Sequence, residues 1–304
     1  MTLLEAGECL DHYRLDALVA QGGMASVYRA TDIRTGRQCA IKIPHQAAEC
    51  DIAGYDRFQR EAAICRELDH PGVLKAISEE GQTQVYMAME WVDGQSLRQI
   101  LSREGRLPVE RAKRIALAVC SALEHIHTHG VVHRDLKPEN VIIDSSDDHV
   151  KLIDFGIARK SGSRRLTFGK LSNVMGTADY ISPEQVRSRR GDARSDLYSL
   201  GIMLYEMLTG ETPFDGDNPF AVMNARLHDS IRPASEIVAA LPRQFDAVLQ
   251  RALERDPDRR YVSASEFAYD LEHLDQIDPT RCSKPRKEAP YKKWFAQRFL
   301  LWGR

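Results

Sequence analysis

Five short strings along the chain carry side chains that could bind phosphate groups and a divalent cation. In chain order they are Gly22-Gly23, Cys39-Ala40-Ile41-Lys42, His133-Arg134-Asp135-Leu136-Lys137-Pro138-Glu139-Asn140, Asp154-Phe155-Gly156 and Ser182-Pro183-Glu184. The oxygens of Asn140 and Asp154 are hard ligands of the kind that Mg²⁺ prefers. Taken singly, Lys42 could be a solvated strand lysine, and Asp135 and Asp154 could be turn residues or caps. Taken as a set, the strings favour chemistry on phosphate groups.

The order and spacing of these strings resemble those of the eukaryotic-type serine/threonine protein kinases. The resemblance covers roughly residues 13–275 and is strongest in HRDLKPEN, which is followed fourteen residues later by DFG. The string GTADYISPEQ is more similar to bacterial members of the family. The resemblance implies an α+β, bilobal fold with a β-rich N-lobe at 13–92, which holds one key helix, and a larger helical C-lobe at 93–275. Residues 1–12 are then an N-terminal extension, and 276–304 a basic linker and amphipathic tail.

The resemblance also implies a function and a set of partners. The chain is expected to transfer the γ-phosphate of ATP to serine and threonine hydroxyls of proteins, with Mg²⁺ or Mn²⁺ as the metal. We expect a role in signalling, with autophosphorylation of the activation segment and self-association as one way to achieve it. The substrate protein and the activating signal are not evident from one sequence.

Roles for individual residues follow from their positions in the family motifs. Lys42 is expected to contact the α- and β-phosphates and Glu61 to pair with Lys42. Asp135 is the expected catalytic base or orienter of the substrate hydroxyl, and Lys137 the expected partner of the γ-phosphate. The expected metal ligands are Asn140 and Asp154. The expected ATP-binding positions are Ala20, Gly22, Gly23, Val27, Ala40, Lys42, Met89, Glu90, Val92, Asn140 and Asp154.

Other positions are expected to support the site. By resemblance Glu184 pairs with Arg260, Asp196 holds the catalytic-loop backbone, and Thr177 contacts that loop. Arg134 would anchor a phosphorylated residue of the activation segment through charge-assisted hydrogen bonds. The candidate phosphorylation sites in that segment, in order of preference, are Ser172, Thr167, Ser161 and Ser163.

One departure from the family pattern leaves alternatives open. The phosphate loop usually has three glycines, but here Ala20 and Ala25 replace the outer two, and the added Cβ atoms restrict the backbone. A pseudokinase that binds nucleotide without catalysis is therefore one alternative, although Lys42, Asp135 and Asp154 are intact. A small-molecule kinase of related fold is the other, and the protein-kinase-like segment from Asp154 to Glu184 argues against it.

The elements that position these residues can be predicted from periodicity. Short β-type runs at 13–19, 26–30 and 38–43 predict strands separated by glycine turns, and the apolar run at 84–89 predicts a further strand. Helical spacing predicts helices at 55–68, 111–129, 195–209, 245–253 and 264–274. In the first of these helices Glu61 falls on the apolar stripe, where a buried acid needs a partner.

The charge distribution separates a basic tail from an acidic body. Residues 281–304 carry eight Lys or Arg and one Glu, a net charge of +7, whereas the whole chain has −2 and residues 1–280 therefore −9. The acidic body argues against nucleic-acid binding. Six cysteines without C-x-x-C spacing favour a cytoplasmic location, and neither a signal peptide nor a membrane-spanning run is expected.

The tail itself allows three interpretations. Its aromatic face and flanking cations would suit a peripheral helix on an anionic membrane, or docking on the acidic body or on another protein. The third alternative is a disordered end, and the aromatic content argues against it. The face comprises Tyr291, Trp294, Phe295, Phe299 and Trp302, flanked by Lys292, Lys293 and Arg298.

Overall fold

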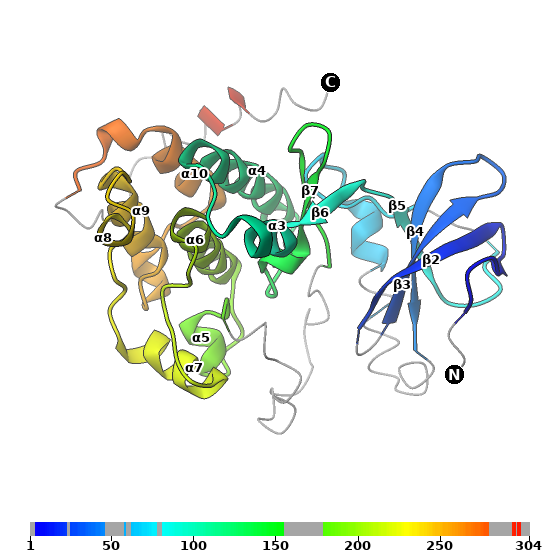
Figure 1. Ribbon diagram of the computed structural model, residues 1–304, viewed down its shortest axis with the longest axis horizontal. Coiled ribbons are helices and arrows are strands. Elements are labelled where there is room, and N and C mark those ends of the chain that lie inside the picture. Colours follow the sequence, from blue (N-terminus) through cyan, green and yellow to red (C-terminus); the bar gives the residue numbers. More distant parts are fainter. Residues whose placement is uncertain are drawn as a thin grey trace. The chain divides into compact units, whose positions relative to one another are not determined.

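The computed structural model describes residues 4–22, 25–45, 58, 62–77, 81–154, 179–279, 294–295 and 297–298. The chain divides into two compact units, with the division between Asp93 and Gly94. The first unit is built on an antiparallel sheet, and the second is mainly helical with a small sheet (Figure 1). This content agrees with the predicted α+β class.

The sheet of the first unit has five strands that pair in chain order. They are β1 (Cys9–Leu10), β2 (Tyr13–Gln21), β3 (Ala25–Asp32), β4 (Gln38–Pro44) and β5 (Met87–Glu90). The structure confirms the first three predicted strands to within two residues at each end. Because side chains alternate along a strand, one face of the sheet can bury a core, here around Leu15, Tyr28 and Ile41. Residues 9–10, expected in the N-terminal extension, extend this sheet.

The fourth predicted strand starts later than its sequence pattern suggested. β5 begins only at Met87, where its pairing with β4 starts, and residues before it bond to Asp11 through their side chains. The hydroxyls of Tyr86 and Thr83 donate to the two carboxylate oxygens of Asp11, at 2.8 and 2.7 Å. These bonds, that of Thr83 above all, lower the pKa of Asp11.

The predicted helix at 55–68 is described only in part. Residues 58 and 62–67 are helical, and Phe58, Ala62, Cys65 and Leu68 are buried as the apolar stripe predicted. Glu61 lies outside the described residues.

The second unit begins with short elements and continues as a helical assembly (Figure 1). A three-stranded antiparallel sheet is formed by β6 (Gly94–Ser96), β7 (Val141–Asp144) and β8 (Val150–Leu152). The helices are α3 (Leu97–Glu104), α4 (Val109–Thr128), α5 (Pro183–Val186), α6 (Ala193–Thr209), α7 (Pro219–His228), α8 (Ala234–Ile237), α9 (Gln244–Ala252) and α10 (Ala264–Glu272), with 3₁₀ turns at Pro138–Asn140, Pro257–Arg259 and Leu274–Gln276. The predicted helices in this unit are confirmed to within two residues.

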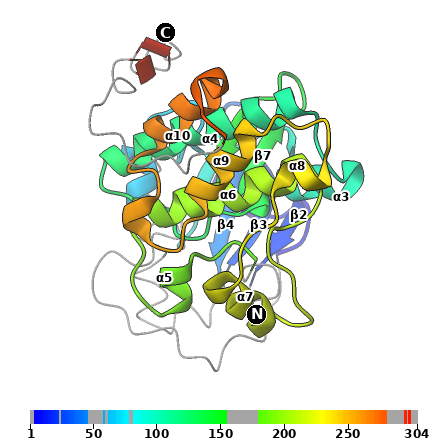
Figure 2. The same cartoon turned by 90° about the vertical axis from the view of Figure 1, so that its left-hand side faces the viewer.

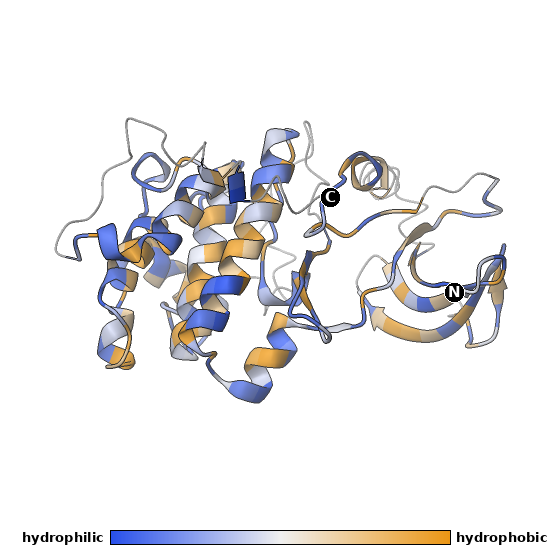
Figure 3. Cartoon of the chain, turned by 90° about the horizontal axis from the view of Figure 1, so that it is seen from above, coloured by the Kyte–Doolittle hydropathy of each residue, from blue (hydrophilic) through white to orange (hydrophobic). Residues whose placement is uncertain are grey.

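Helix α6 is the centre of the second unit. It contacts α4, α8 and α9, and α10 packs on α4 and α9 (Figure 2). All its residues from Ser195 to Leu208 are buried, and Figure 3 shows apolar residues concentrated along the interior helices. The Asp192 side chain caps its N-terminus, and Gly210, with φ 87°, ends it in the left-handed conformation. A Cβ at Gly201 would lie 2.9 Å from the Cβ of Ala252, so a glycine lets α6 and α9 approach closely.

A buried ion pair joins α5 to the segment before α10. Arg260 donates to both carboxylate oxygens of Glu184, at 2.9 and 2.8 Å, which confirms the predicted pairing. Ser195 Oγ donates to the same carboxylate at 2.6 Å, and the guanidinium lies over the Tyr198 ring. Burial alone would raise the pKa of Glu184, but the bonds and charge of Arg260 outweigh it and lower that pKa to about 2.

Two further observations concern the described part of the chain. None of its helices combines the length and apolarity that crossing a bilayer requires. The four cysteines described there, Cys9, Cys39, Cys65 and Cys120, are not in disulfide bonds.

We predict that Glu184→Gln destabilises the protein by about 3–5 kcal/mol at pH 7, because it leaves the Arg260 charge buried without a counter-ion. A carboxyl whose pKa falls from 4.5 to about 2 on folding stabilises the protein above pH 4.5 and loses this effect as the pH falls toward 2. The difference between wild type and variant in the free energy of unfolding, measured with urea, should therefore shrink as the pH falls from 4.5 toward 2.

The control for this prediction is Glu236→Gln, which removes an exposed pair with Arg232. We expect a loss below about 1 kcal/mol there. If the two variants lost the same free energy of unfolding, the buried pair would contribute no more to stability than the exposed one, contrary to this prediction.

Candidate active site

One face of the first unit's sheet gathers most of the predicted nucleotide-binding residues. Directly paired residues of neighbouring strands point to the same face, and so do residues two apart on one strand. Lys42 pairs with Val27 on one side and with Met87 on the other, and Val27 also pairs with Ala20.

A second row of residues on the same face lies two positions away along the strands. Ala40 pairs with Arg29 of β3 and with Met89 of β5. Ala20, Val27, Ala40, Lys42 and Met89 therefore share one face. The core cluster of Tyr28 and Ile41 occupies the other face.

The last strand of this sheet ends at the predicted adenine-binding segment. Met89 is buried, and Glu90 is held on its outer side by two bonds with the backbone of Lys75. The Glu90 amide donates to the Lys75 carbonyl at 3.0 Å, and the Lys75 amide donates to Glu90 Oε1 at 2.8 Å. Val92 follows in an irregular, half-buried stretch just before the division between the units.

The second unit brings two predicted catalytic side chains, Asp135 and Lys137, into contact with the predicted metal ligand Asn140. Lys137 Nζ donates to Asp135 Oδ2 at 2.8 Å. Asn140 Nδ2 donates to the Asp135 carbonyl at 2.8 Å and lies 3.3 Å from Oδ2. Asn140 is 5% exposed, whereas the Asp135 side chain keeps 34% of its surface exposed. The loop at 133–140 therefore exposes the Asp135 carboxylate, and Lys137 and Asn140 fix the direction of that carboxylate from two sides.

The backbone of this loop is held by a buried carboxylate of α6. The amides of His133 and Arg134 donate to Asp196 Oδ2 and Oδ1, at 2.9 and 2.8 Å, as the resemblance predicted. His127 Nε2 of α4 lies 2.8 Å from Asp196 Oδ2. Arg134 has φ 63°, a conformation that costs free energy in a non-glycine residue and needs outside support. The Gln185 amide group adds to that support by donating to the Arg134 carbonyl at 3.0 Å.

Asp154 is positioned by the same loop. The Ile153 amide donates to the Asn140 carbonyl at 3.0 Å, so that Asp154 follows directly beside Asn140. His133 Nε2 lies 3.2 Å from the Ile153 carbonyl, which ties the two segments together. Burial lowers the pKa of His133, although the Asp196 and Asp135 charges oppose the shift. A neutral His133 at pH 7 is a buttress and not a proton donor to the site.

Several predicted residues lie outside the described part of the chain. The structure therefore gives no position for their contacts with Lys42, His133 or the loop. These residues are Gly23, Glu61, Phe155, Thr177 and the candidate phosphorylation sites Ser161, Ser163, Thr167 and Ser172.

A cluster of hydrogen-bonded charged and tyrosine side chains, which the sequence did not suggest, includes one residue of the loop at 133–140. Arg98 of α3 donates to Glu206 Oε1 at 2.7 Å, to Glu139 Oε1 at 3.1 Å and to the Tyr180 hydroxyl. Tyr180 in turn donates to Glu206 Oε2 at 2.5 Å. Glu139 is part of HRDLKPEN and Tyr180 of GTADYISPE, so this cluster joins two of the strings through one arginine. Its members are up to 108 residues apart in sequence, so no local spacing could have indicated it.

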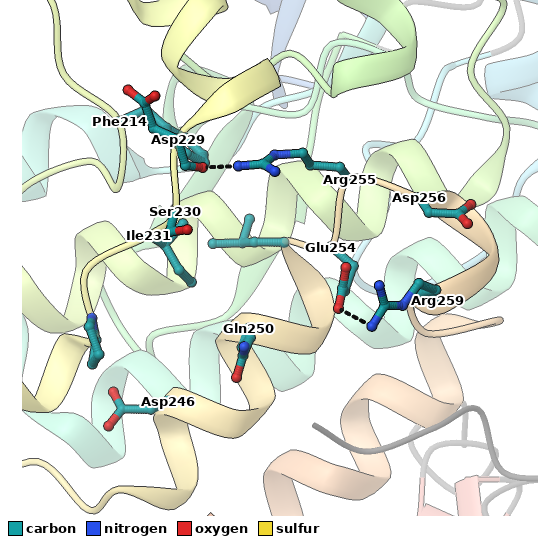
Figure 4. A pocket seen from close by; sticks show the side chains of 12 residues that line it. Phe214, Asp229, Ser230, Ile231, Asp246, Gln250, Glu254, Arg255, Asp256 and Arg259 are labelled. Atoms are coloured by element: carbon teal, nitrogen blue, oxygen red, sulfur yellow. Dashed lines mark hydrogen bonds and ion pairs between the residues drawn. The ribbon is translucent and has the colours of Figure 1, made fainter. Parts of the chain in front are cut away.

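No ready-made cluster of metal ligands marks the site within the described residues. A pocket of about 370 Å³ lies elsewhere in the second unit, lined by Phe214, Leu253 and paired charged side chains such as Arg259 and Glu254 (Figure 4). No group of three or more His, Cys, Asp or Glu in the described ranges could hold a metal ion. The oxygens of Asn140 and Asp154 form a sparser ligand set, which suits Mg²⁺ because that ion keeps water and phosphate ligands.

Each comparison with known proteins matches this chain to protein kinases. The protein kinase domain family matches residues 13–270. The serine/threonine-protein kinase PknB of Mycolicibacterium smegmatis is 41% identical over 267 residues, which cover 86% of this chain and 42% of that protein. PknB of Mycobacterium tuberculosis is 38% identical over 285 residues, covering 92% and 45%. The chain thus spans less than half the length of these relatives.

Solved structures agree with the sequence relatives. The PknI kinase domain of Mycobacterium tuberculosis, a C20A_R136A double mutant, is 27% identical with a TM-score of 0.70, and the match covers 90% of this chain and 99% of that one. Rad53 residues 1–466 in complex with AMP-PNP is also 27% identical, with a TM-score of 0.69 and coverage of 84% and 64%. The chain belongs to the eukaryotic-type serine/threonine protein kinases and resembles the bacterial members of that family.

Proposed function

We propose that this chain is an active serine/threonine protein kinase that transfers the γ-phosphate of ATP to protein hydroxyls. The family uses ATP, a divalent metal and protein substrates. The observation that carries the proposal is the Asp135 carboxylate, fixed by Lys137 and Asn140 yet exposed enough to meet a substrate. A pseudokinase usually lacks the strand lysine, the catalytic aspartate or the metal-binding aspartate, and here Lys42, Asp135 and Asp154 are all present. The first unit then corresponds to the N-lobe at 13–92 and the second to the C-lobe at 93–275.

Nucleotide binding is assigned to the sheet face of the first unit. Ala40 and Val27 offer small apolar surface to the adenine ring, and Lys42, one row away, offers its charge to the phosphates. Glu61 would orient Lys42. The backbone groups at Glu90 and Val92 would bond the adenine edge, with Gly22 and Gly23 in the loop above the phosphates. Rad53 was solved in complex with AMP-PNP, which supports nucleotide binding in this fold.

The transfer step is assigned to the loop of the second unit. Asp135 would orient the substrate hydroxyl and accept its proton, while Lys137 would neutralise charge on the γ-phosphate. Asn140 and Asp154 would hold Mg²⁺ or Mn²⁺, which supplies positive charge against the triphosphate. The Asn140 amide nitrogen is already bonded to Asp135, so its oxygen is the atom left for a metal.

Self-association, membrane contact and cellular location stay predictions. Phosphorylation of one copy by another would require self-association, which the activation-segment prediction below addresses. A peripheral membrane contact of the basic tail and a cytoplasmic location also stay predictions, and the tail is considered again below.

We predict that Asp135→Asn and Lys42→Met each lower phosphoryl transfer by roughly 100-fold or more without unfolding the protein. The first change removes the proton acceptor, and the second removes a cation from the phosphates. Transfer from ³²P-labelled ATP to a generic basic protein measures both. The matched controls are Asp275→Asn and Lys75→Met, at exposed positions, and should transfer as wild type does. Wild-type rates from a correctly folded Asp135→Asn protein would refute the mechanism.

Metal dependence is the second prediction of this mechanism. Removing divalent ions with EDTA should abolish transfer, and adding Mg²⁺ or Mn²⁺ back should restore it. Asp154→Asn should raise the metal concentration needed for half-maximal rate, because an amide binds hard cations less tightly than a carboxylate. Turnover that continues after exhaustive chelation would exclude a metal role for Asn140 and Asp154.

We also predict that activity depends on phosphorylation between residues 157 and 177. Ser172 is the first expected site, then Thr167, Ser161 and Ser163, and the Arg134 guanidinium would bind the added phosphate. Mass spectrometry of active protein, before and after phosphatase treatment, locates the site. Co-expression of wild type with Asp135→Asn tests whether one copy modifies another. Fully active protein without any phosphate in this segment would contradict the prediction.

A further inference from the structure

The end of α10 carries a preformed platform of two aromatic rings. Tyr269 and His273 are four residues apart, and their rings stack with centroids 4.1 Å apart at 20°. His273 Nδ1 lies 2.8 Å from the Tyr269 carbonyl, and its backbone amide donates to the same oxygen at 3.0 Å. Because the histidine is held by its own helix end, the ring pair keeps its shape before anything binds to it.

A distant part of the chain is seated on this platform. The Trp294 ring meets Tyr269 and His273 edge to face, at 5.6 Å from each and at interplanar angles of 88° and 73°. Arrangements of this kind are favourable, since the positive ring edge faces a negative ring face. Trp294 is half-buried.

An ion pair fixes the same segment one turn further along. Arg298 Nη2 lies 2.8 Å from Glu272 Oε1, and Glu272 lies on α10 between the two platform residues. The other oxygen of Glu272 lies 3.6 Å from Lys113 Nζ of α4. Glu272 thus presents a carboxylate that α4 already holds in place.

We propose that Tyr269, Glu272 and His273 form a docking site on the second unit for the aromatic and basic segment around Trp294–Arg298 of the same chain. Charge over the whole chain favours this occupant, because residues 281–304 carry +7 and residues 1–280 carry −9. Docking uses the tryptophan and the arginine that a membrane-surface helix would need. A docked segment is therefore withheld from anionic surfaces, and this inference does not depend on catalytic activity.

Hydrogen exchange of the amides of residues 294–298 in the full chain tests the proposal. Tyr269→Ala and Glu272→Arg should each speed that exchange about tenfold, because the first removes one of the two rings that Trp294 meets and the second removes the partner of Arg298. The reversed pair, Glu272→Arg with Arg298→Glu, should slow exchange again relative to Glu272→Arg alone, which a folding defect could not do. The Lys113 cation beside position 272 keeps the restoration partial. Glu211→Lys, a charge reversal just after α6, is the control and should leave exchange unchanged.

Co-sedimentation with mixed phosphatidylserine and phosphatidylcholine vesicles gives the second readout. Glu272→Arg should bind the vesicles more than wild type, since it frees the segment. Two results would overturn the proposal: wild-type exchange that is already as fast as in Glu272→Arg, or wild-type protein that sediments with vesicles as fully as the variant does.

Discussion

The catalytic loop depends on one buried carboxylate. Asp196 is 1% exposed and accepts both the His133 and the Arg134 amides, with His127 beside it. A buried charge is costly unless it is fully hydrogen-bonded, and here the backbone supplies the bonds. In return the carboxylate holds Arg134 at a positive φ that the residue would not otherwise keep. The direction of Asp135, the next residue, follows from this constraint.

The rest of the second unit makes Asp196 a firm support. It lies on α6, whose residues 195–208 are all buried, so the carboxylate moves little relative to the core. Arginines fix the neighbouring segments. The buried Arg260 pairs with Glu184 and the buried Arg251 with Glu266 and Asp270, and the half-buried Arg98 pairs with the buried Glu206. Such pairs add little net stability compared with apolar packing, but breaking one leaves an unpaired buried charge. They therefore act mainly by selecting one arrangement of the chain.

Much of the fold and of the candidate site could be predicted from the sequence, wherever the pattern that indicates a structure is local. Short β-type runs located β2, β3 and β4, and helical periodicity located α4, α6, α9 and α10. Motif resemblance correctly paired Glu184 with Arg260 and Asp196 with the loop backbone. Prediction failed where partners are distant and carry no motif. The bonds of Thr83 and Tyr86 with Asp11 span more than seventy residues of sequence, and the clusters of Arg98 and Arg251 join residues that no spacing connects. Likewise, the sequence offered three interpretations of the tail, because which surface Trp294 meets depends on the folded position of α10.

The most direct test of this dependence is steady-state transfer by Asp196→Asn, which keeps the size of the side chain but offers one acceptor oxygen in place of two. Asp192→Asn, which conserves the N-cap of the same helix, is the matched control. If Asp196 positions the loop, kcat should fall by roughly 100-fold while KM for ATP changes little, since a small misplacement of a catalytic group has that effect. A folded Asp196→Asn protein with the kcat of wild type would contradict it.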